Sequence, residues 1–582
     1  MMIWRTEHIV QETNFYTYVQ ARERENQSLH YSNTVAIVGG GPKGLYALNH
    51  FINQLKLYPT SKYFKILWFN QDKLFGCGPN YDIHQPDYLL INYCIGHVQA
   101  FHPDYRDYEN QKSFVDWLTA VKTIDTPVAP TDFASRALVG RYLQWVATET
   151  TRNLPTNVQL ELISQPVTTI TYQDIKVMVE TQTGAWEVDS LLLATGHCYQ
   201  NSPLVHHPEI PAAHYIRAAY PVSQFAAIPP QEHVGVVGLG LTFIDIALAL
   251  TEGRGGVFSH GQYKPTGKEP VIYPFSRTSL PICCRGPQYH AQRPLFLMTD
   301  AWFRTLMDRS AKIDFLTEVL PSIEKEVQLA YYSVLIGSTD LQAILKKIKC
   351  VPKEERFTLK DLLQPSLGSE EEIVSYIQMN IEEAHKGEDK SPRMAAAAVW
   401  GKICPWIADL YRTVGYTGAS QQQLDSYYFG AFNRVSYGPP IANMEKIYAL
   451  AKAGIIRFCA FQNPKVRWQT RQQTFLIQDP SGLEIQVATL IDARIGRPAL
   501  QKKNAFFYDN LLQQGLIKQH ENEGYSPGTL SMDKHGKCTT INNVPVYCYG
   551  SNTEGVFFDN DTLSRTKNNT ACYWVEETLK DR

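Results

Sequence analysis

The sequence lacks an excess of charge of either sign. Its 582 residues include 55 lysines and arginines and 57 aspartates and glutamates, so the formal net charge is −2 and the sequence pI is about 6.8. This balance provides no extended positive field for a nucleic-acid backbone or an anionic membrane surface. We therefore expect small-molecule ligands rather than nucleic acid or membrane, and the oligomeric state stays open.

Long hydrophobic runs are also scarce. The N-terminal region carries the charged stretch Arg22–Glu25 and lacks the continuous apolar core of a signal peptide. The most apolar stretch, residues 234–250, contains Asp245 and is shorter than the roughly 20 residues that a membrane-spanning helix needs. We interpret this stretch as a buried strand and helix, and we expect a soluble protein.

Cysteine pairs of the Cys-x-x-Cys type are absent, although the chain has 11 cysteines. An odd number of scattered cysteines fits reduced thiols in a cytoplasm, and the missing dithiol disfavours a disulfide reductase. Paired catalytic carboxylates and a nucleophile elbow are not recognisable either. The histidines are too scattered to predict a metal site, among them His97, His102, His197 and His290. The sequence therefore identifies no catalytic side chain and no metal ligand.

The sequence does contain two glycine-rich turns. The first, Gly39-Gly40-Gly41-Pro42-Lys43-Gly44, follows the apolar run Thr34–Val38 and precedes apolar residues at helical spacing, Leu45, Leu48, Ile52 and Leu55. Glycine lets the backbone approach a diphosphate closely, and amide groups at the helix N-terminus then bind its charge. The pattern predicts a strand, a turn and a helix that bind a dinucleotide, although glycines also form ordinary turns.

The second turn, Gly238-Leu239-Gly240, repeats this arrangement far downstream, after the apolar run Val234–Val237. Phe243 stands where a third glycine is expected, so the following helix is predicted to pack further from its strand, or the ligand to lie differently. A purely structural turn is the alternative here. With this second turn, one chain is predicted to bind two dinucleotides.

One residue after each turn is predicted to contact a ribose. Asn70 ends the strand-like run Phe64–Phe69, where an acidic residue normally binds a ribose hydroxyl, and its alternative role is that of a turn residue. Arg277 follows the strand-like run Val271–Ser276, where an arginine favours the 2′-phosphate of NADPH over NADH. A solvated surface arginine is the alternative for that position.

The order of segments predicts an α/β fold with two Rossmann-like dinucleotide-binding domains. Each half closes with alternating strand-like segments, which indicates a β-meander that returns the chain to its sheet. A helical region interrupts the second domain. We predict an N-terminal extension over 1–32, a first nucleotide domain over 33–203 and 497–582, a second over 204–299 and 454–496, and a helical insert over 300–453 as the candidate substrate region.

Within the helical insert, one helix start is signalled directly. Ser369-Glu370-Glu371-Glu372 has the Ser-x-x-Glu form of a capping box and is followed by apolar residues from Ile373 onward. The pattern predicts a helix that begins just after Ser369.

Several motifs resemble those of two-dinucleotide flavoproteins that include the bacterial N-hydroxylating monooxygenases. The resemblance is carried by Gly39-x-Gly41-Pro42-x-x-Leu45 and by Leu193-Ala194-Thr195-Gly196-His197. A closer resemblance, to a bacterial branch of FAD/NAD(P)-binding proteins with members that oxidise the amino group of aspartate to a nitro group, is carried by further segments: 75–81, 89–92, 135–143, 434–439 and 550–555.

This resemblance implies FAD on the first turn and NADPH on the second. It assigns to FAD the residues Gly39, Gly41, Pro42, Lys43, Gly44 and Asn70, with Asn92 and Gly550 nearer the flavin ring. It assigns to NADPH the residues Gly238, Gly240, Thr242 and Arg277. An amino-acid carboxylate favours an arginine fork, for which Arg285 and Arg434 are the candidates, although either arginine has a structural role as its alternative.

The resemblance also implies the reaction. We expect an NADPH-dependent flavin monooxygenase that uses oxygen, through a flavin hydroperoxide, to oxidise the amino group of a small amino-acid-like substrate. Two alternatives stay open from the residues alone: a flavin-dependent dehydrogenase or reductase without oxygenation, and a non-catalytic FAD-binding sensor.

Overall fold

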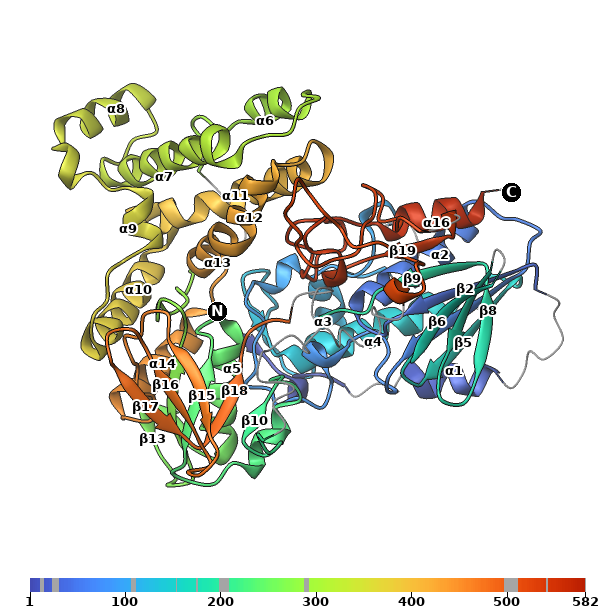
Figure 1. Cartoon of the computed structure of the whole chain (residues 1–582), viewed down its shortest axis with the longest axis horizontal. Helices are drawn as coiled ribbons and strands as arrows, with labels where there is room; N and C mark the ends of the chain where they lie inside the picture. The colour runs from blue at the N-terminus through green and yellow to red at the C-terminus, as the bar shows by residue number, and fades with distance from the viewer. Residues whose placement is uncertain are drawn as a thin grey trace.

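A computed structural model describes ten stretches of the chain: residues 1–10, 15–23, 31–105, 111–152, 154–173, 176–197, 209–286, 293–496, 511–540 and 543–580. Two parallel sheets lie apart from each other, and a mainly helical region packs beside the second one (Figure 1). No helix in these stretches is long and apolar enough to span a membrane.

The first sheet has five parallel strands in the order β19-β9-β2-β3-β5. Its strands are β2 (Asn33–Val38), β3 (Phe64–Asn70), β5 (Val158–Ser164), β9 (Ser190–Leu193) and β19 (Val546–Cys548). The helices α2 (Pro42–Leu57), α4 (Arg136–Arg152) and α16 (Ala571–Leu579) pack against one face. The antiparallel strands β6 (Thr169–Gln173), β7 (Lys176–Glu180) and β8 (Ala185–Val188) pack against the other. Because both faces are covered, the strands are almost continuously apolar.

The second sheet has four parallel strands in the order β10-β18-β11-β14. They are β10 (Tyr215–Ile216), β11 (His233–Val237), β14 (Val271–Phe275) and β18 (Thr489–Asp492). Helix α5 (Leu241–Ala249) packs on one face, and the meander β15 (Lys465–Gln469), β16 (Thr474–Gln478) and β17 (Glu484–Val487) packs on the other. The predicted fold class, with two Rossmann-like units that each carry a meander, is confirmed.

Between β14 and β15 the chain is helical, as predicted. The helices are α6 (Asp300–Met307), α7 (Leu320–Leu335), α8 (Leu341–Cys350), α9 (Leu359–Leu363), α10 (Glu370–Lys390), α11 (Pro392–Thr413), α12 (Gly418–Gln423), α13 (Phe429–Ser436) and α14 (Ile441–Lys452). Helices α10 and α14 also pack on the second sheet through the same core as α5. The helical region is therefore continuous with the second nucleotide unit rather than a separate body.

Helix α10 begins where the capping pattern predicts, but only half of the capping box forms. Ser369 Oγ accepts a hydrogen bond from the Glu372 amide at 3.2 Å. The Glu372 carboxylate accepts instead from the Gly368 amide, at 2.6 Å, rather than from Ser369. The Gly368 amide, one residue before the N-cap, thus donates to the Glu372 carboxylate in place of the Ser369 amide.

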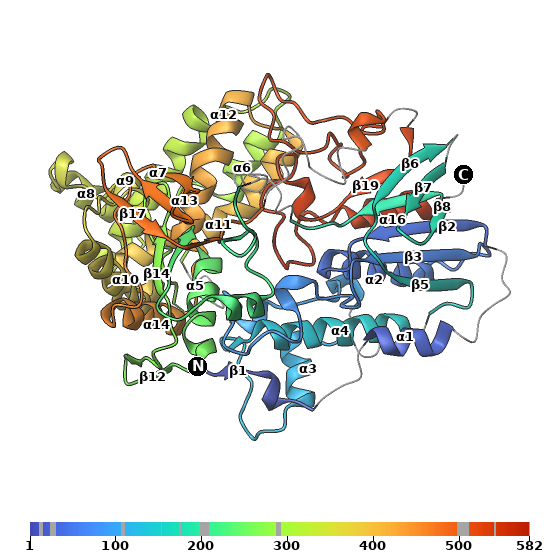
Figure 2. The same ribbon diagram turned by 60° about the horizontal axis from the view of Figure 1, so that its bottom comes forward.

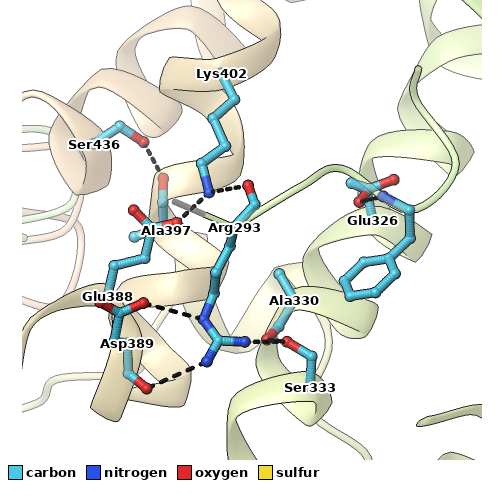
Figure 3. Close-up of polar contacts among 10 residues, drawn as sticks. Arg293, Glu326, Ala330, Ser333, Glu388, Asp389, Ala397, Lys402 and Ser436 are labelled. Carbon is cyan, nitrogen blue, oxygen red and sulfur yellow. Dashed lines mark hydrogen bonds and ion pairs between the residues drawn. The ribbon is translucent and has the colours of Figure 1, made fainter. Parts of the chain in front are cut away.

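A polar cluster joins three helices of the helical region near the end of α10 (Figure 3). Lys402 on α11 forms an ion pair with Glu388 and donates a hydrogen bond to the Arg293 carbonyl at 3.1 Å. The Arg293 guanidinium lies 3.6 Å from the Asp389 carboxylate and donates to Ser333 on α7 at 3.2 Å. Because each cation of this cluster pairs with a carboxylate of α10, we interpret the cluster as structural.

The N-terminal segment packs into the first unit. Strand β1 (Ile3–Trp4) pairs with β4 (Phe133–Ala134), and α1 (Phe15–Glu23) lies along α4 below the first sheet (Figure 2). The side chains of Trp4 and Phe15 are fully buried. This segment therefore contributes to the first hydrophobic core.

Candidate functional site

Two glycines of the first turn are required by steric contacts within the protein. Gly39 has a φ of +126°, and a Cβ there would lie 2.1 Å from the Ala194 carbonyl oxygen. A Cβ on Gly44 would lie 2.1 Å from the Gly39 carbonyl oxygen and 3.0 Å from Trp68 Nε1, which itself donates to that oxygen. Helix α2 thus approaches strand β2 as closely as the backbone allows.

Gly41 is different, because no contact with the described residues requires a glycine there. Its φ is −81°, which any residue adopts, and no atom of the residues that the structure places lies within 4 Å of the position that a Cβ would take. The open space lies at the N-terminus of α2, where amide groups and the helix dipole attract a negative group. An open cradle at this point fits the diphosphate of FAD.

Asn70 lies directly over this turn. A Cβ on Gly40 would lie 2.2 Å from Asn70 Cγ, and the Asn70 amide donates to Asp72 at 2.8 Å. The structure therefore brings Asn70 to the predicted edge of the FAD turn. The sequence pattern did not single out Gly40, although this contact makes it as restricted as its neighbours.

The second turn repeats the first in two of its three positions. Gly238 has a φ of +119°, and within the described part of the chain no atom lies within 4 Å of a Cβ on Gly240. Phe243, which replaces the third glycine, is 2% exposed and packs in the core of the second unit. The second turn thus offers the same open cradle while its helix is spaced by an aromatic ring.

A cavity of about 1800 Å³ connects the two nucleotide units, the helical region and the C-terminal segment. The predicted site residues in its lining are Asn92, Gly238, Gly240, Thr242, Arg277, Arg285 and Arg434. The predicted FAD residues Gly39, Gly41, Pro42, Lys43, Gly44, Asn70 and Gly550 lie outside this lining. Two of them meet, because a Cβ on Gly550 would lie 2.9 Å from Lys43 Cγ.

Asn92 and Arg285 form the wall where the first unit meets the helical region. The Asn92 amide donates to the Tyr437 carbonyl at 3.2 Å, and the Arg285 guanidinium donates to the Asn92 carbonyl at 2.9 Å. Burial lowers the pKa of Arg285, and the groups that oppose this effect are Cys94, Tyr437 and Tyr93. No carboxylate in the described part of the chain forms an ion pair with Arg285, so its charge faces the cavity without an acidic partner.

The other two predicted arginines have different surroundings. The Arg434 guanidinium donates to the Pro281 carbonyl at 3.3 Å and to the Leu363 carbonyl at 3.0 Å, with Leu362 and Tyr376 as further acceptors. These bonds occupy the guanidinium and tie α13 to α9. Arg277 is exposed at the cavity rim and donates to the Ser426 carbonyl at 3.2 Å.

A buried ion pair between the two nucleotide units was missed from the sequence. Arg136, at the start of α4, lies 3.0 Å from the Asp245 carboxylate on α5, and Tyr220 donates to the same carboxylate at 2.5 Å. The side chains of Arg136 and Asp245 are 12% and 3% exposed. A carboxylate inside the most apolar stretch of the sequence was the available signal, but its partner was not recognisable.

These features define a class of protein. Two Rossmann-like units with glycine-rich open cradles, meanders and a shared cavity form a two-dinucleotide flavoprotein. A family profile described as FAD-NAD(P)-binding matches residues 36–198.

The chain is also similar to two named relatives. It is 26% identical over 552 residues to a nitrosuccinic acid synthase from Aspergillus oryzae, with 86% of this chain and 84% of that protein covered. It is 24% identical over 562 residues to an L-aspartate N-monooxygenase (nitrosuccinate-forming) from Streptomyces davaonensis, with 84% of this chain and 86% of that protein covered.

Among solved structures, an L-lysine 6-monooxygenase from Pseudomonas syringae matches with a TM-score of 0.48 at 11% identity, covering 94% of this chain and 100% of that one. The named relatives confirm the predicted class. The protein is a flavin-dependent oxidoreductase related to amino-acid N-monooxygenases, and FAD and NADPH are its cofactors.

Proposed function

We propose that this protein oxidises the amino group of aspartate, or of a similar acidic amino acid, with NADPH and oxygen. The observation that carries the proposal is Arg285, a largely buried guanidinium that faces the shared cavity without an acidic partner in the described part of the chain. The named relatives act on aspartate or form nitrosuccinate. A carboxylate of the substrate would form an ion pair with the Arg285 guanidinium.

The proposed roles of the other residues follow from the two turns. Gly39, Gly41, Pro42, Lys43, Gly44 and Asn70 would hold the adenosine diphosphate part of FAD, with Asn92 and Gly550 nearer its ring. Gly238, Gly240, Thr242 and Arg277 would hold NADPH. Bound FAD would supply the redox chemistry, which is hydride acceptance and oxygen activation. The protein itself orients the substrate and keeps water away from the reacting atoms.

Arg434 has a structural rather than a binding role in this proposal, since backbone carbonyls and Tyr376 already accept from its guanidinium. Arg434 and Arg285 both line the cavity, and Arg434 holds α13 against α9 there. The proposal also places the protein in a reducing cytoplasm, because all cysteines in the described part of the chain are free.

Product analysis tests the proposal directly. The purified yellow protein is incubated with NADPH, oxygen and a panel of amino acids, and we expect hydroxylamine, oxime or nitro products from aspartate. NADPH consumption that yields only peroxide with every amino acid would favour the reductase alternative and contradict the proposal. A flavin that NADPH fails to bleach without oxygen would favour a non-catalytic sensor.

The role of Arg285 is tested by two substitutions. Arg285→Met removes the charge, and we expect the KM for aspartate to rise about 100-fold, because a charge-assisted bidentate pair is lost. Arg285→Lys keeps the charge and is expected to recover part of the affinity. Equal KM values for all three proteins would exclude Arg285 as the carboxylate ligand.

A further inference from the structure

Arg565 is a buried cation without a hydrogen-bond partner. The residue is 2% exposed and lies in the C-terminal segment that lines the cavity. None of its nitrogens, Nε, Nη1 and Nη2, has a hydrogen-bond partner within the described stretches. Its guanidinium carbon lies 5.2 Å from the centroid of the Tyr46 ring on α2. Burying an arginine, which stays ionised, is costly unless the charge is paired.

Other polar groups without hydrogen-bond partners lie near this guanidinium. The Tyr549 hydroxyl and His50 Nε2 also lack hydrogen-bond partners among the residues the structure places. The Lys43 ammonium lies 4.9 Å from the Tyr549 ring and donates to the Ser564 carbonyl at 3.0 Å. We name Lys43, Tyr46, His50, Tyr549 and Arg565 the Arg565 cluster. Its members include one lysine and one arginine but no carboxylate.

The electrostatics of the cluster reflect uncompensated positive charge. Burial lowers the pKa of Lys43 to about 7, and the positive charges of Arg565 and Lys567 lower it further than Asp559 and Asp561 raise it. Burial, Arg565 and His102 lower the pKa of His50 to about 3. A negative group placed between Lys43 and Arg565 would relieve this repulsion.

The second nucleotide unit has a carboxylate partner for its buried arginine, which the first unit lacks among the described residues. Tyr46 and Asp245 occupy the same position relative to the two glycine turns, each two residues after Gly44 or Phe243. An arginine reaches both helices at that point, Arg565 in the first unit and Arg136 in the second. Arg136 meets a carboxylate there, whereas Arg565 meets an aromatic ring. Among the described residues Arg565 therefore has no carboxylate partner, and the Tyr549 hydroxyl beside it, whose pKa burial raises, is a neutral group that leaves the charge of Arg565 uncompensated.

We infer that the Arg565 cluster binds an oxyanion, either a carboxylate of the substrate or a phosphate group of FAD. A guanidinium fork matches both groups, and the Lys43 ammonium and the Tyr549 hydroxyl supply additional donors. Both sources are adjacent, because Arg565 lines the cavity and Lys43 belongs to the first turn. The carboxylate source rests on the proposed function, whereas the phosphate source requires only FAD binding.

Binding measurements without turnover test this inference. FAD affinity is measured on the apoprotein by quenching of flavin fluorescence, and aspartate and succinate affinities are measured on the FAD-loaded protein by calorimetry, without NADPH. We expect Arg565→Gln to weaken one of these affinities at least tenfold and Arg565→Lys to recover part of the loss. The control is Arg457→Gln, because Arg457 is 55% exposed and pairs with Glu370 at the surface; its affinities should stay within twofold of the wild type.

The pattern of losses identifies the source of the oxyanion. Weaker FAD binding indicates a phosphate, and weaker binding of both aspartate and succinate with unchanged FAD binding indicates a carboxylate. If every affinity of folded Arg565→Gln stays within twofold of the wild type, the inference is wrong. None of these readouts depends on product formation, so they stand even if the proposed reaction fails.

Wild-type protein provides a second test in case the variants do not fold. At matched ionic strength, phosphate or succinate is expected to raise the thermal midpoint of the apoprotein more than chloride does, because a ligand of the native state stabilises it. Equal midpoints in all three salts would overturn the inference.

Discussion

The two nucleotide units share a design and differ at the third position of the turn. In the first unit, Gly44 lets α2 contact the backbone of the turn, and a Cβ would lie 2.1 Å from the Gly39 carbonyl oxygen. In the second unit, Phe243 fills the corresponding place and is 2% exposed. The first glycine of each turn is thus set by its positive φ, and the second leaves open space for a ligand. The residue at the third position depends on how closely the helix packs on its sheet.

The units also differ in what covers their sheets. Helices α2, α4 and α16 cover the first sheet. Of these, α2 directly follows the turn, α4 comes later in the chain, and α16 lies in the C-terminal segment. The second sheet is covered by α5 together with α10 and α14 of the helical region. The helical region completes the core of the second unit. We therefore expect a core substitution in one of the two regions to lower the stability of the other as well.

Adding a side chain at Gly44 is expected to destabilise the first nucleotide unit strongly. We expect Gly44→Ala to destabilise the protein by about 3 kcal/mol, since its Cβ must displace backbone that cannot yield easily. Chemical denaturation of the apoprotein measures this effect. Phe243→Ala is the counterpart in the second unit, and it should also destabilise by about 3 kcal/mol, but through a cavity rather than a clash. A neutral Gly44→Ala would contradict the steric account.

Removing the carboxylate that distinguishes Asp245 from Tyr46 is expected to destabilise the protein to a similar extent. Asp245→Asn leaves the buried charge of Arg136 unpaired, which should cost about 3 kcal/mol of stability. Because the pair joins the two units, we also expect slower reduction of FAD by NADPH in anaerobic stopped-flow measurements. Reduction by dithionite serves as the control, since it does not need the second unit. Equal slowing with both reductants would argue against a positioning role.

Gly41→Ala is expected to separate an effect on FAD binding from an effect on folding stability. No atom of the described stretches lies within 4 Å of the added methyl group, so the apoprotein should be as stable as the wild type or gain up to about 1 kcal/mol. FAD should bind about 30-fold more weakly, because the methyl group displaces the diphosphate from charge-assisted hydrogen bonds worth about 2 kcal/mol. Gly240→Ala is expected to do the same to NADPH without affecting FAD. Unchanged FAD affinity in Gly41→Ala would show that the cradle is not the diphosphate site.

The smallest effect is expected at Arg277. Its side chain is exposed at the cavity rim, so loss of a contact with the 2′-phosphate should cost only about 1 kcal/mol. We expect Arg277→Ala to lower the preference for NADPH over NADH about fivefold. The ratio of kcat/KM for the two nucleotides measures this preference. A parallel loss with NADPH and NADH would instead indicate a general structural role.

Sequence reasoning succeeded where the determining contacts are local. The glycine turns, the meanders and the start of α10 depend on residues close together in the chain, so spacing alone predicts them. It did not separate Arg285 from Arg434, because the two differ only in what surrounds them: carbonyls from two other segments occupy Arg434, whereas Arg285 meets a single one at Asn92. The acceptors lie far from either arginine in sequence.

By itself, then, the chain specified two strand-turn-helix units with room for two dinucleotides, because φ values and close backbone approach are properties of single positions. Only the tertiary structure decided which charges are paired. Arg136 meets Asp245 and Arg565 meets Tyr46 across distances that no local pattern records. The energy of a buried charge depends on every group folded around it, and those groups come together only when the whole chain is packed.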